Sequence, residues 1–200
     1  MNVGNIGNAY GAYNYTNKVQ NNSGKSFGAA IGNVTDMSSP NLTLHMSKDG
    51  DAEKSVSSWA NANTGQSITV YQPEDYDPAN PVYKMKIWDK DDNLIEERNI
   101  DINSIDPNNA DSYEMYALSV YGEKSGICPD AVTRFMMMHA KQEAEQRAQT
   151  GSYSLDIQEK WLDILNNFMK EQLDMGFMDG YLKNKAYLDF LTDEQINTWH

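Results

Sequence analysis

The chain has 200 residues, enough for one domain with a tail. Its formal net charge of −13 repels phosphate backbones and anionic membrane surfaces, so we expect no nucleic-acid partner. No run approaches the roughly 18 apolar residues of a membrane span, and no secretory signal is recognisable. We therefore expect a cytoplasmic protein, or one exported by a leaderless route. Cys128 is the single cysteine, which excludes an internal disulfide and a multi-cysteine zinc site.

Residues 1–40 differ in composition from the rest of the chain. They are dominated by Asn, Gly, Ser, Tyr and Ala, and their only charged side chains are Lys18, Lys25 and Asp36. Few residues there could enter a core, so burial cannot offset the entropy lost on ordering. This composition predicts a disordered polar arm over 1–40, followed by a single α+β domain over 41–200.

Residues 42–100 show the pattern of an antiparallel β-meander of four or five strands. Alternation at Leu42, Leu44 and Met46 predicts a first strand. A weaker strand is predicted over 55–59, and a β-branched run predicts another over 67–71. Residues 82–88 and 94–100 flank the polar stretch 89–93, which has the length and chemistry of a hairpin turn.

After residue 106 the hydrophobic period becomes helical, which predicts a cluster of four helices within about 111–198. Asp111 and Glu114 have the spacing of a capping box for the first helix. Pro129 fits the first position of the second helix. The third stretch, 157–173, has the broadest apolar face and includes Trp161, so we expect it to anchor the core. Strands followed by helices favour an α+β fold.

Two sequence runs carry a resemblance to known proteins. The run over 69–83, TVYQPEDYDPANPVY, and the run over 100–109, IDINSIDPNN, resemble uncharacterised proteins of anaerobic gut Firmicutes, as does the Tyr- and Asn-rich start. The resemblance covers the arm and residues 69–120. It implies a bacterial source, and it transfers no activity and no functional residue.

Two motifs suggest ligand chemistry but lack essential parts. The Gly-Lys-Ser of a phosphate-binding loop occurs at 24–26, but Val19 stands where that motif requires a glycine. Residues 89–93 suggest a calcium loop, but Leu94 occupies the glycine position and Ile100 the closing glutamate position. We therefore predict no cofactor and no metal site, and we interpret 89–93 as a solvated turn.

The sharpest catalytic hypothesis is a hydrolase whose site is assembled in the fold around Cys128. A helix N-terminus at Cys128 would lower the pKa of its thiol. His139 lies eleven residues along the same predicted helix, roughly 16 Å away at 1.5 Å per residue, which is too far for a general base. His45 or His200 would then have to serve, and no spacing places either beside Cys128. We assign no catalytic residue.

The preferred hypothesis is a non-enzymatic protein-interaction or export-related protein. It rests on the missing catalytic motifs, the polar arm and an acidic surface that bears aromatic residues. We predict that partner-binding aromatic residues are partly exposed, at Trp59, Tyr76, Trp88 and Trp199. Met136–138 and the apolar face over 157–173 form a second possible partner surface, although core packing is the more economical explanation for both.

Overall fold

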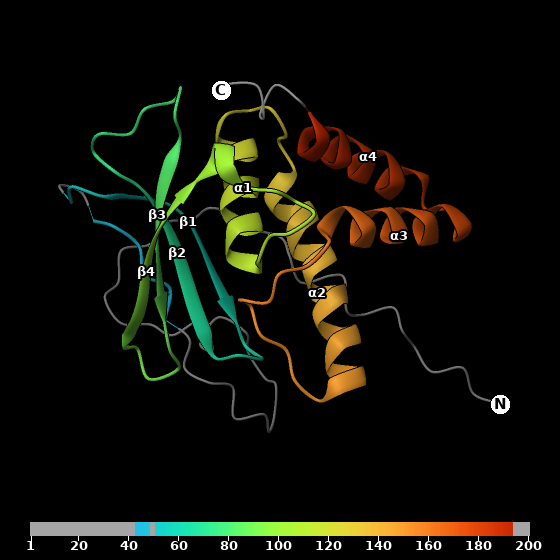
Figure 1. Ribbon diagram of the computed structural model, residues 1–200, viewed down its shortest axis with the longest axis horizontal. Helices are drawn as coiled ribbons and strands as arrows, with labels where there is room; N and C mark the ends of the chain where they lie inside the picture. Colours follow the sequence, from blue (N-terminus) through green and yellow to red (C-terminus); the bar gives the residue numbers. More distant parts are fainter. Residues whose placement is uncertain (1–42, 49–50, 194–200) are drawn as a thin grey trace.

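The computed structural model describes residues 43–48 and 51–193, and it has an α+β fold. Within these residues four strands come first and four α-helices follow, as the hydrophobic periods predict. In Figure 1 the sheet forms one layer, α1 and α2 lie next to it, and α3 and α4 lie beyond them. The predicted arm over 1–40 lies outside the described residues.

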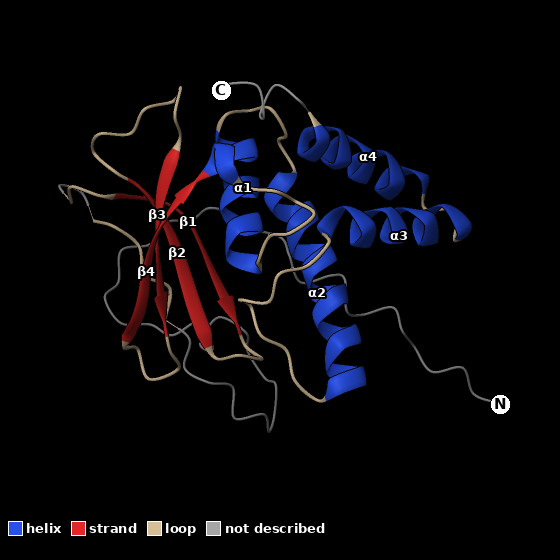
Figure 2. Cartoon of the chain, in the orientation of Figure 1, coloured by secondary structure: helices blue, strands red, loops and turns tan. Residues whose placement is uncertain are grey.

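The sheet is an antiparallel meander in the order β1-β2-β3-β4, as Figure 2 shows. Its strands are β1 (Lys54–Asn61), β2 (Gln66–Gln72), β3 (Val82–Trp88) and β4 (Leu94–Asp101). The register pairs Ile68 with Ile87 and Val70 with Met85, which places these four side chains on the face that meets the helices.

A fifth strand over 42–46 is not formed in the described residues, because residues 43–48 are irregular. Side chains of β1 and β2, rather than the backbone of a neighbouring strand, form hydrogen bonds with this segment. The Ser47 amide donates to Ser55 Oγ at 2.9 Å, and Thr69 Oγ1 donates to the His45 carbonyl at 2.8 Å. The segment therefore lies on the face of the sheet that is turned away from the helices, which we call the outer face.

A 3-10 turn, η2 (Ile102–Ser104), connects the sheet to α1 (Ser112–Lys124). The capping box predicted at α1 is confirmed. Asp111 accepts the amide N–H of Glu114 at 2.8 Å, and Glu114 accepts the amide N–H of Asp111 at 2.9 Å. Helix α2 (Ala131–Thr150) starts two residues after Pro129, because 129–130 form a turn in which the Ala131 amide donates to the Cys128 carbonyl.

Helices α3 (Trp161–Asp174) and α4 (Met178–Thr192) form a hairpin. Trp161 is fully buried, in agreement with its expected role as an anchor, whereas Ile157 precedes the helix and is exposed. One hydrophobic cluster joins the helix-facing side of the sheet to all four helices; its largest fully buried members are Trp161, Tyr116, Tyr187, Phe135, Ile68, Met85 and Ile87. No helix in the described part of the chain is both long enough and apolar enough to span a bilayer.

Candidate functional site

The turn between α3 and α4 carries the densest group of exposed apolar side chains among the described residues. We call this group the α3–α4 tip, and its members are 46% to 61% exposed: Leu173, Met175, Phe177, Met178 and Leu182. In Figure 1 the turn lies at the end of the helical layer that is farthest from the sheet. Exposed apolar side chains that are scattered singly are normal on a protein surface, but five within ten residues concentrate apolar surface at this one turn.

Backbone chemistry fixes this turn. Gly176 has a φ of 76°, a left-handed conformation that glycine adopts without strain, and it ends α3. The Phe177 amide donates to the Gln172 carbonyl at 2.8 Å, which closes the turn. Phe177 then occupies the N-cap position of α4, where it supplies no side-chain hydrogen bond. A polar cap there would stabilise the helix by about 1 kcal/mol, so the exposed Phe177 is not explained by helix stability.

A polar contact holds the two helices together beneath the tip. Asn184 Nδ2 donates to Gln172 Oε1 at 2.8 Å, and both side chains are buried. Gly180 permits this approach, because a Cβ at that position would lie 2.9 Å from Gln172 Nε2. The tip is therefore presented on a hairpin with a defined interhelical contact.

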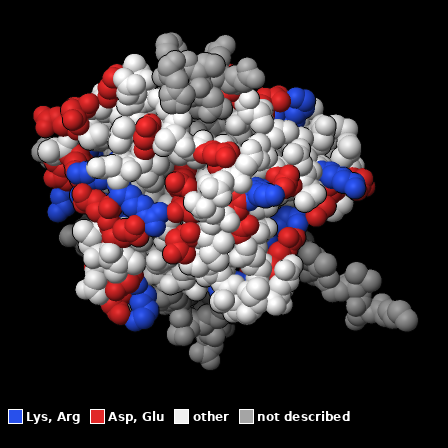
Figure 3. All heavy atoms as spheres, viewed as in Figure 1, with Lys and Arg blue, Asp and Glu red and all other residues white. Residues whose placement is uncertain are grey.

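Charged side chains surround the tip. Three carboxylates and two lysines lie within 170–183: Glu171, Asp174, Asp179, Lys170 and Lys183. Lys183 pairs with Asp179 at 3.0 Å, and Glu171 pairs with Lys141 of α2 at 3.1 Å. Figure 3 shows acidic and basic groups interspersed over the face in view, with no large block of one sign.

A second unusual feature is the buried imidazole of His139 in α2. Four aromatic rings surround it, with centroid distances of 4.7 Å to Trp59, 5.5 Å to Phe135, 5.3 Å to Tyr153 and 6.3 Å to Trp161. We call these four rings the aromatic box. Burial in the box lowers the pKa of His139 to about 4. The imidazole is therefore neutral at pH 7.

Glu143, one helical turn after His139, is also buried. Its Oε2 accepts a 3.1 Å hydrogen bond from Asn61 Nδ2 and lies 4.0 Å from His139 Nδ1. Glu143 Oε1 and His139 Nε2 are buried and have no hydrogen-bond partner within the part of the chain that the structure describes. Sequence reasoning found His139 but missed Glu143 and Asn61, because they lie 82 residues apart and only the fold brings them together.

Tyr153 contacts the His139 ring and also reaches the surface. It belongs to the irregular segment 151–160, and its hydroxyl is 2.9 Å from Ser112 Oγ. It also lines a shallow surface hollow of about 420 Å³, together with Thr64, Gln66, Asp89, Lys90, Ile95 and Ser154. Of the four rings of the aromatic box, Tyr153 is the one that is only half-buried.

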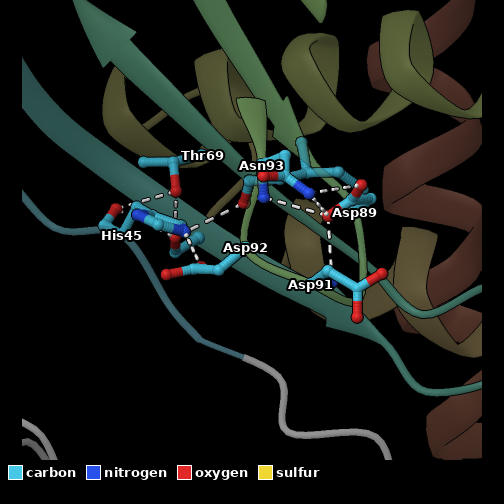
Figure 4. A network of polar contacts seen from close by, with 8 residues as sticks. His45, Thr69, Asp89, Asp91, Asp92 and Asn93 are labelled. Atoms are coloured by element: carbon cyan, nitrogen blue, oxygen red, sulfur yellow. Dashed lines mark hydrogen bonds and ion pairs between the residues drawn. The ribbon is translucent and has the colours of Figure 1, made fainter. Parts of the chain in front are cut away.

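The outer face of the sheet carries a polar network around His45, shown in Figure 4. The His45 ring stacks on Trp88 with centroids 3.7 Å apart, and its Nε2 lies 2.8 Å from Asp92 Oδ1. Asp92 belongs to the β3–β4 turn, where Asp89 accepts the amide N–H groups of Asp91 and Asn93 at 2.9 Å. These bonds lower the pKa of Asp89. They show that 89–93 is an internally bonded turn, as interpreted from the sequence.

The four aromatic residues predicted to be partly exposed differ from one another in their burial. The prediction is wrong for Trp59 and Trp88, each only 8% exposed, because Trp59 is part of the aromatic box and His45 covers Trp88. Tyr76 is half-buried and stacks on Tyr83. Trp199 lies outside the described residues. Sequence reasoning instead missed Phe177, which a search for apolar residues at a helix–helix turn could have found.

Cys128 lies in the turn between α1 and α2 and belongs to the hydrophobic core. Burial raises the pKa of its thiol, the opposite of the decrease expected at a helix N-terminus. His45 is on the outer face, so the sheet separates it from Cys128. His200 is outside the described residues. The geometry therefore supplies no activating base for this thiol from His45 or His139.

Among residues 43–48 and 51–193, no group of three or more His, Cys, Asp or Glu side chains is arranged to hold a metal ion. Comparison of the chain with protein-family models, with curated proteins and with solved structures finds no match.

Proposed function

We propose that this chain is a non-enzymatic interaction protein that binds a basic amphipathic segment of a partner protein through the α3–α4 tip. The observation that carries the proposal is the exposure of Phe177 and its four apolar neighbours on a fixed helical hairpin. Burial of one large apolar side chain is worth roughly 1.5–3 kcal/mol, so a partner that covers this group gains several such contributions.

The side chains of the tip suit a helix as the binding partner. Met175 and Met178 flank Phe177, and unbranched methionine side chains adapt to different apolar surfaces. An amphipathic helix presents apolar anchors at i, i+3, i+4 and i+7, which is a suitable complement to a patch at the end of a helical hairpin.

Charge favours a basic partner over a second copy of the chain. Two copies would each contribute a net charge of −13, which opposes self-association. Asp174 and Asp179 border the tip, and Asp179 is paired with Lys183. A lysine or arginine beside the apolar anchors of a partner would therefore meet Asp174 and compete with Lys183 for Asp179. Such rim contacts raise the association rate, while the apolar tip supplies the affinity.

The experiment uses two labelled amphipathic helical peptides with the same leucine face, one with lysine and one with glutamate on the polar face. Fluorescence anisotropy measures their binding to the full chain. The lysine peptide should bind more tightly, and the double substitution Phe177→Ser with Met178→Ser should weaken its binding at least about tenfold, a loss of about 1.4 kcal/mol.

The matched control is the double substitution Leu94→Ser with Ile95→Ser, because this exposed apolar pair lies on β4. It should leave peptide binding unchanged. Equal loss in both double variants would contradict the proposal, since binding would then follow total apolar surface. Sedimentation of the peptide-free chain as a dimer that the Phe177→Ser/Met178→Ser variant abolishes would identify a second copy as the occupant and overturn the proposal.

A further inference from the structure

Two buried polar groups require a chemical explanation: His139 inside the aromatic box and Glu143 one helical turn after it. His139 is 2% exposed and Glu143 is 5% exposed, and each has one polar atom without a protein partner among the described residues. Leaving a buried acceptor unpaired costs roughly 1–3 kcal/mol, and more when the group is charged. Core packing alone would favour apolar residues at these two positions.

We propose that the aromatic box, with Glu143 and His139, is a concealed binding site for a small organic ammonium ion, and that Tyr153 is its gate. The proposal is independent of the α3–α4 tip. It rests on the unpaired carboxylate oxygen, the surrounding aromatic rings and the position of Tyr153 between them and the surface.

The lining of the box is chemically suited to a cation. Aromatic faces attract cations through their ring quadrupoles, most strongly for tryptophan, and Trp59 and Trp161 both belong to the box. Glu143 Oε1 accepts an N–H from the ammonium group, and Asn61 holds the other oxygen in place at 3.1 Å. The imidazole of His139 is neutral at pH 7, so it accepts a hydrogen bond and adds no opposing positive charge.

Tyr153 provides the route of entry. One side of it contacts His139 edge to face, and it also lines the surface hollow beside Asp89. Its hydroxyl forms a 2.9 Å hydrogen bond with Ser112 Oγ, and its backbone belongs to the irregular segment 151–160. Rotation of the Tyr153 side chain into the hollow would open a ring-sized space next to His139, whose Nδ1 lies 4.0 Å from Glu143 Oε2, while the helices and the sheet stay in place.

The test uses n-butylammonium as the probe and 1-butanol as its neutral counterpart, with the full ¹⁵N-labelled chain. NMR follows the indole N–H signals of Trp59 and Trp161 during titration. Butylammonium should shift both signals in a saturable way with a Kd of about 1 mM or tighter, and butanol should not. Glu143→Gln keeps the size of the side chain but removes its charge, and it should weaken binding at least about tenfold.

Glu145→Gln is the control, because it makes the same charge change on an exposed side chain of the same helix. It should leave the affinity unchanged. Tyr153→Phe removes the Ser112 contact but keeps the ring, so it should bind butylammonium at least as tightly as the original chain.

Three results would overturn the proposal: no saturable shift, equal shifts with butanol, or unchanged affinity in Glu143→Gln. Thermal unfolding checks that each variant is folded. If Glu143→Gln does not fold, the comparison of the charged and neutral probes on the unaltered chain still decides, because it requires no substitution.

Discussion

The indole N–H of Trp161 donates a 2.8 Å hydrogen bond to the carbonyl of Ala110, and both residues are fully buried. This bond joins the first residue of α3 to the segment that leads into α1, 51 positions earlier in the chain. The Ala110 carbonyl also accepts the Glu159 amide N–H at 3.0 Å, and the Trp161 ring packs against Phe135 of α2. Trp161 therefore makes both a polar and an apolar contact within the helical layer.

We expect Trp161→Ala to lower the free energy of unfolding by about 3–5 kcal/mol, because it leaves a cavity and removes one of the two hydrogen bonds that the Ala110 carbonyl accepts. Trp161→Phe should cost less, since it keeps most of the ring volume and loses mainly the hydrogen bond. Urea denaturation measures both values. A loss below about 1 kcal/mol for Trp161→Ala would show that the α3 anchor is not important for the core.

Stability should decrease on acidification through His139. Burial lowers its pKa from 6.5 to about 4, so between these pH values the unfolded chain binds more protons than the folded chain. The free energy of unfolding should therefore fall as pH falls through this window, by roughly 3 kcal/mol in total at 1.36 kcal/mol per pKa unit.

Urea denaturation at several pH values measures this decrease, and the variant His139→Leu should lack this part of it. An NMR titration gives the pKa of His139 directly. A value above 6.5 would contradict the prediction, and it would mean that the Glu143 carboxylate outweighs desolvation.

Gly122 allows α4 to approach α1 closely. A Cβ at this position would lie 2.6 Å from Cζ of Phe190, so Gly122→Ala must displace a buried ring. We expect a loss of about 1–3 kcal/mol in thermal or urea unfolding. Adding Phe190→Leu should restore part of that loss. If the two substitutions are simply additive, the close contact is not the cause.

Cys128 should react slowly with iodoacetamide, because burial both shields its thiol and raises its pKa. The modification rate as a function of pH should give an apparent pKa above the ordinary value near 8.5, and unfolding in urea should accelerate the reaction. An apparent pKa below about 7 would instead reveal an activated thiol and would favour the hydrolase hypothesis.

Local sequence signals predicted most of the fold. Asp111 and Glu114 are three residues apart, and the turn over 89–93 directly connects its two strands, so neighbouring residues determine both structures. The prediction of a strand over 42–46 was wrong because alternation of apolar and polar residues does not reveal whether the edge of a neighbouring strand supplies backbone hydrogen-bond partners. Here Ser55 and Thr69 offer side chains instead.

The candidate sites were harder to predict, because they depend on burial. The sequence does not show that His45 would cover Trp88, or that Glu143 would meet Asn61. The sequence did not predict the α3–α4 tip for a different reason. Leu173 fits the apolar period of α3, so it was assigned to the core, but the helix extends past the layer that could cover it.

The order of the sheet has a consequence for folding kinetics. Every strand pairs with its neighbour along the chain, and α3 and α4 are joined by a three-residue turn, so these pairings close only short loops. The contacts between Ser57 and Tyr116 and between Asn61 and Glu143 close loops of 59 and 82 residues, and they form only when the sheet meets the helices. We therefore expect the hairpins to form early and the docking of the two layers to limit the folding rate, with Trp59 reporting that slow step by fluorescence as it enters the interface.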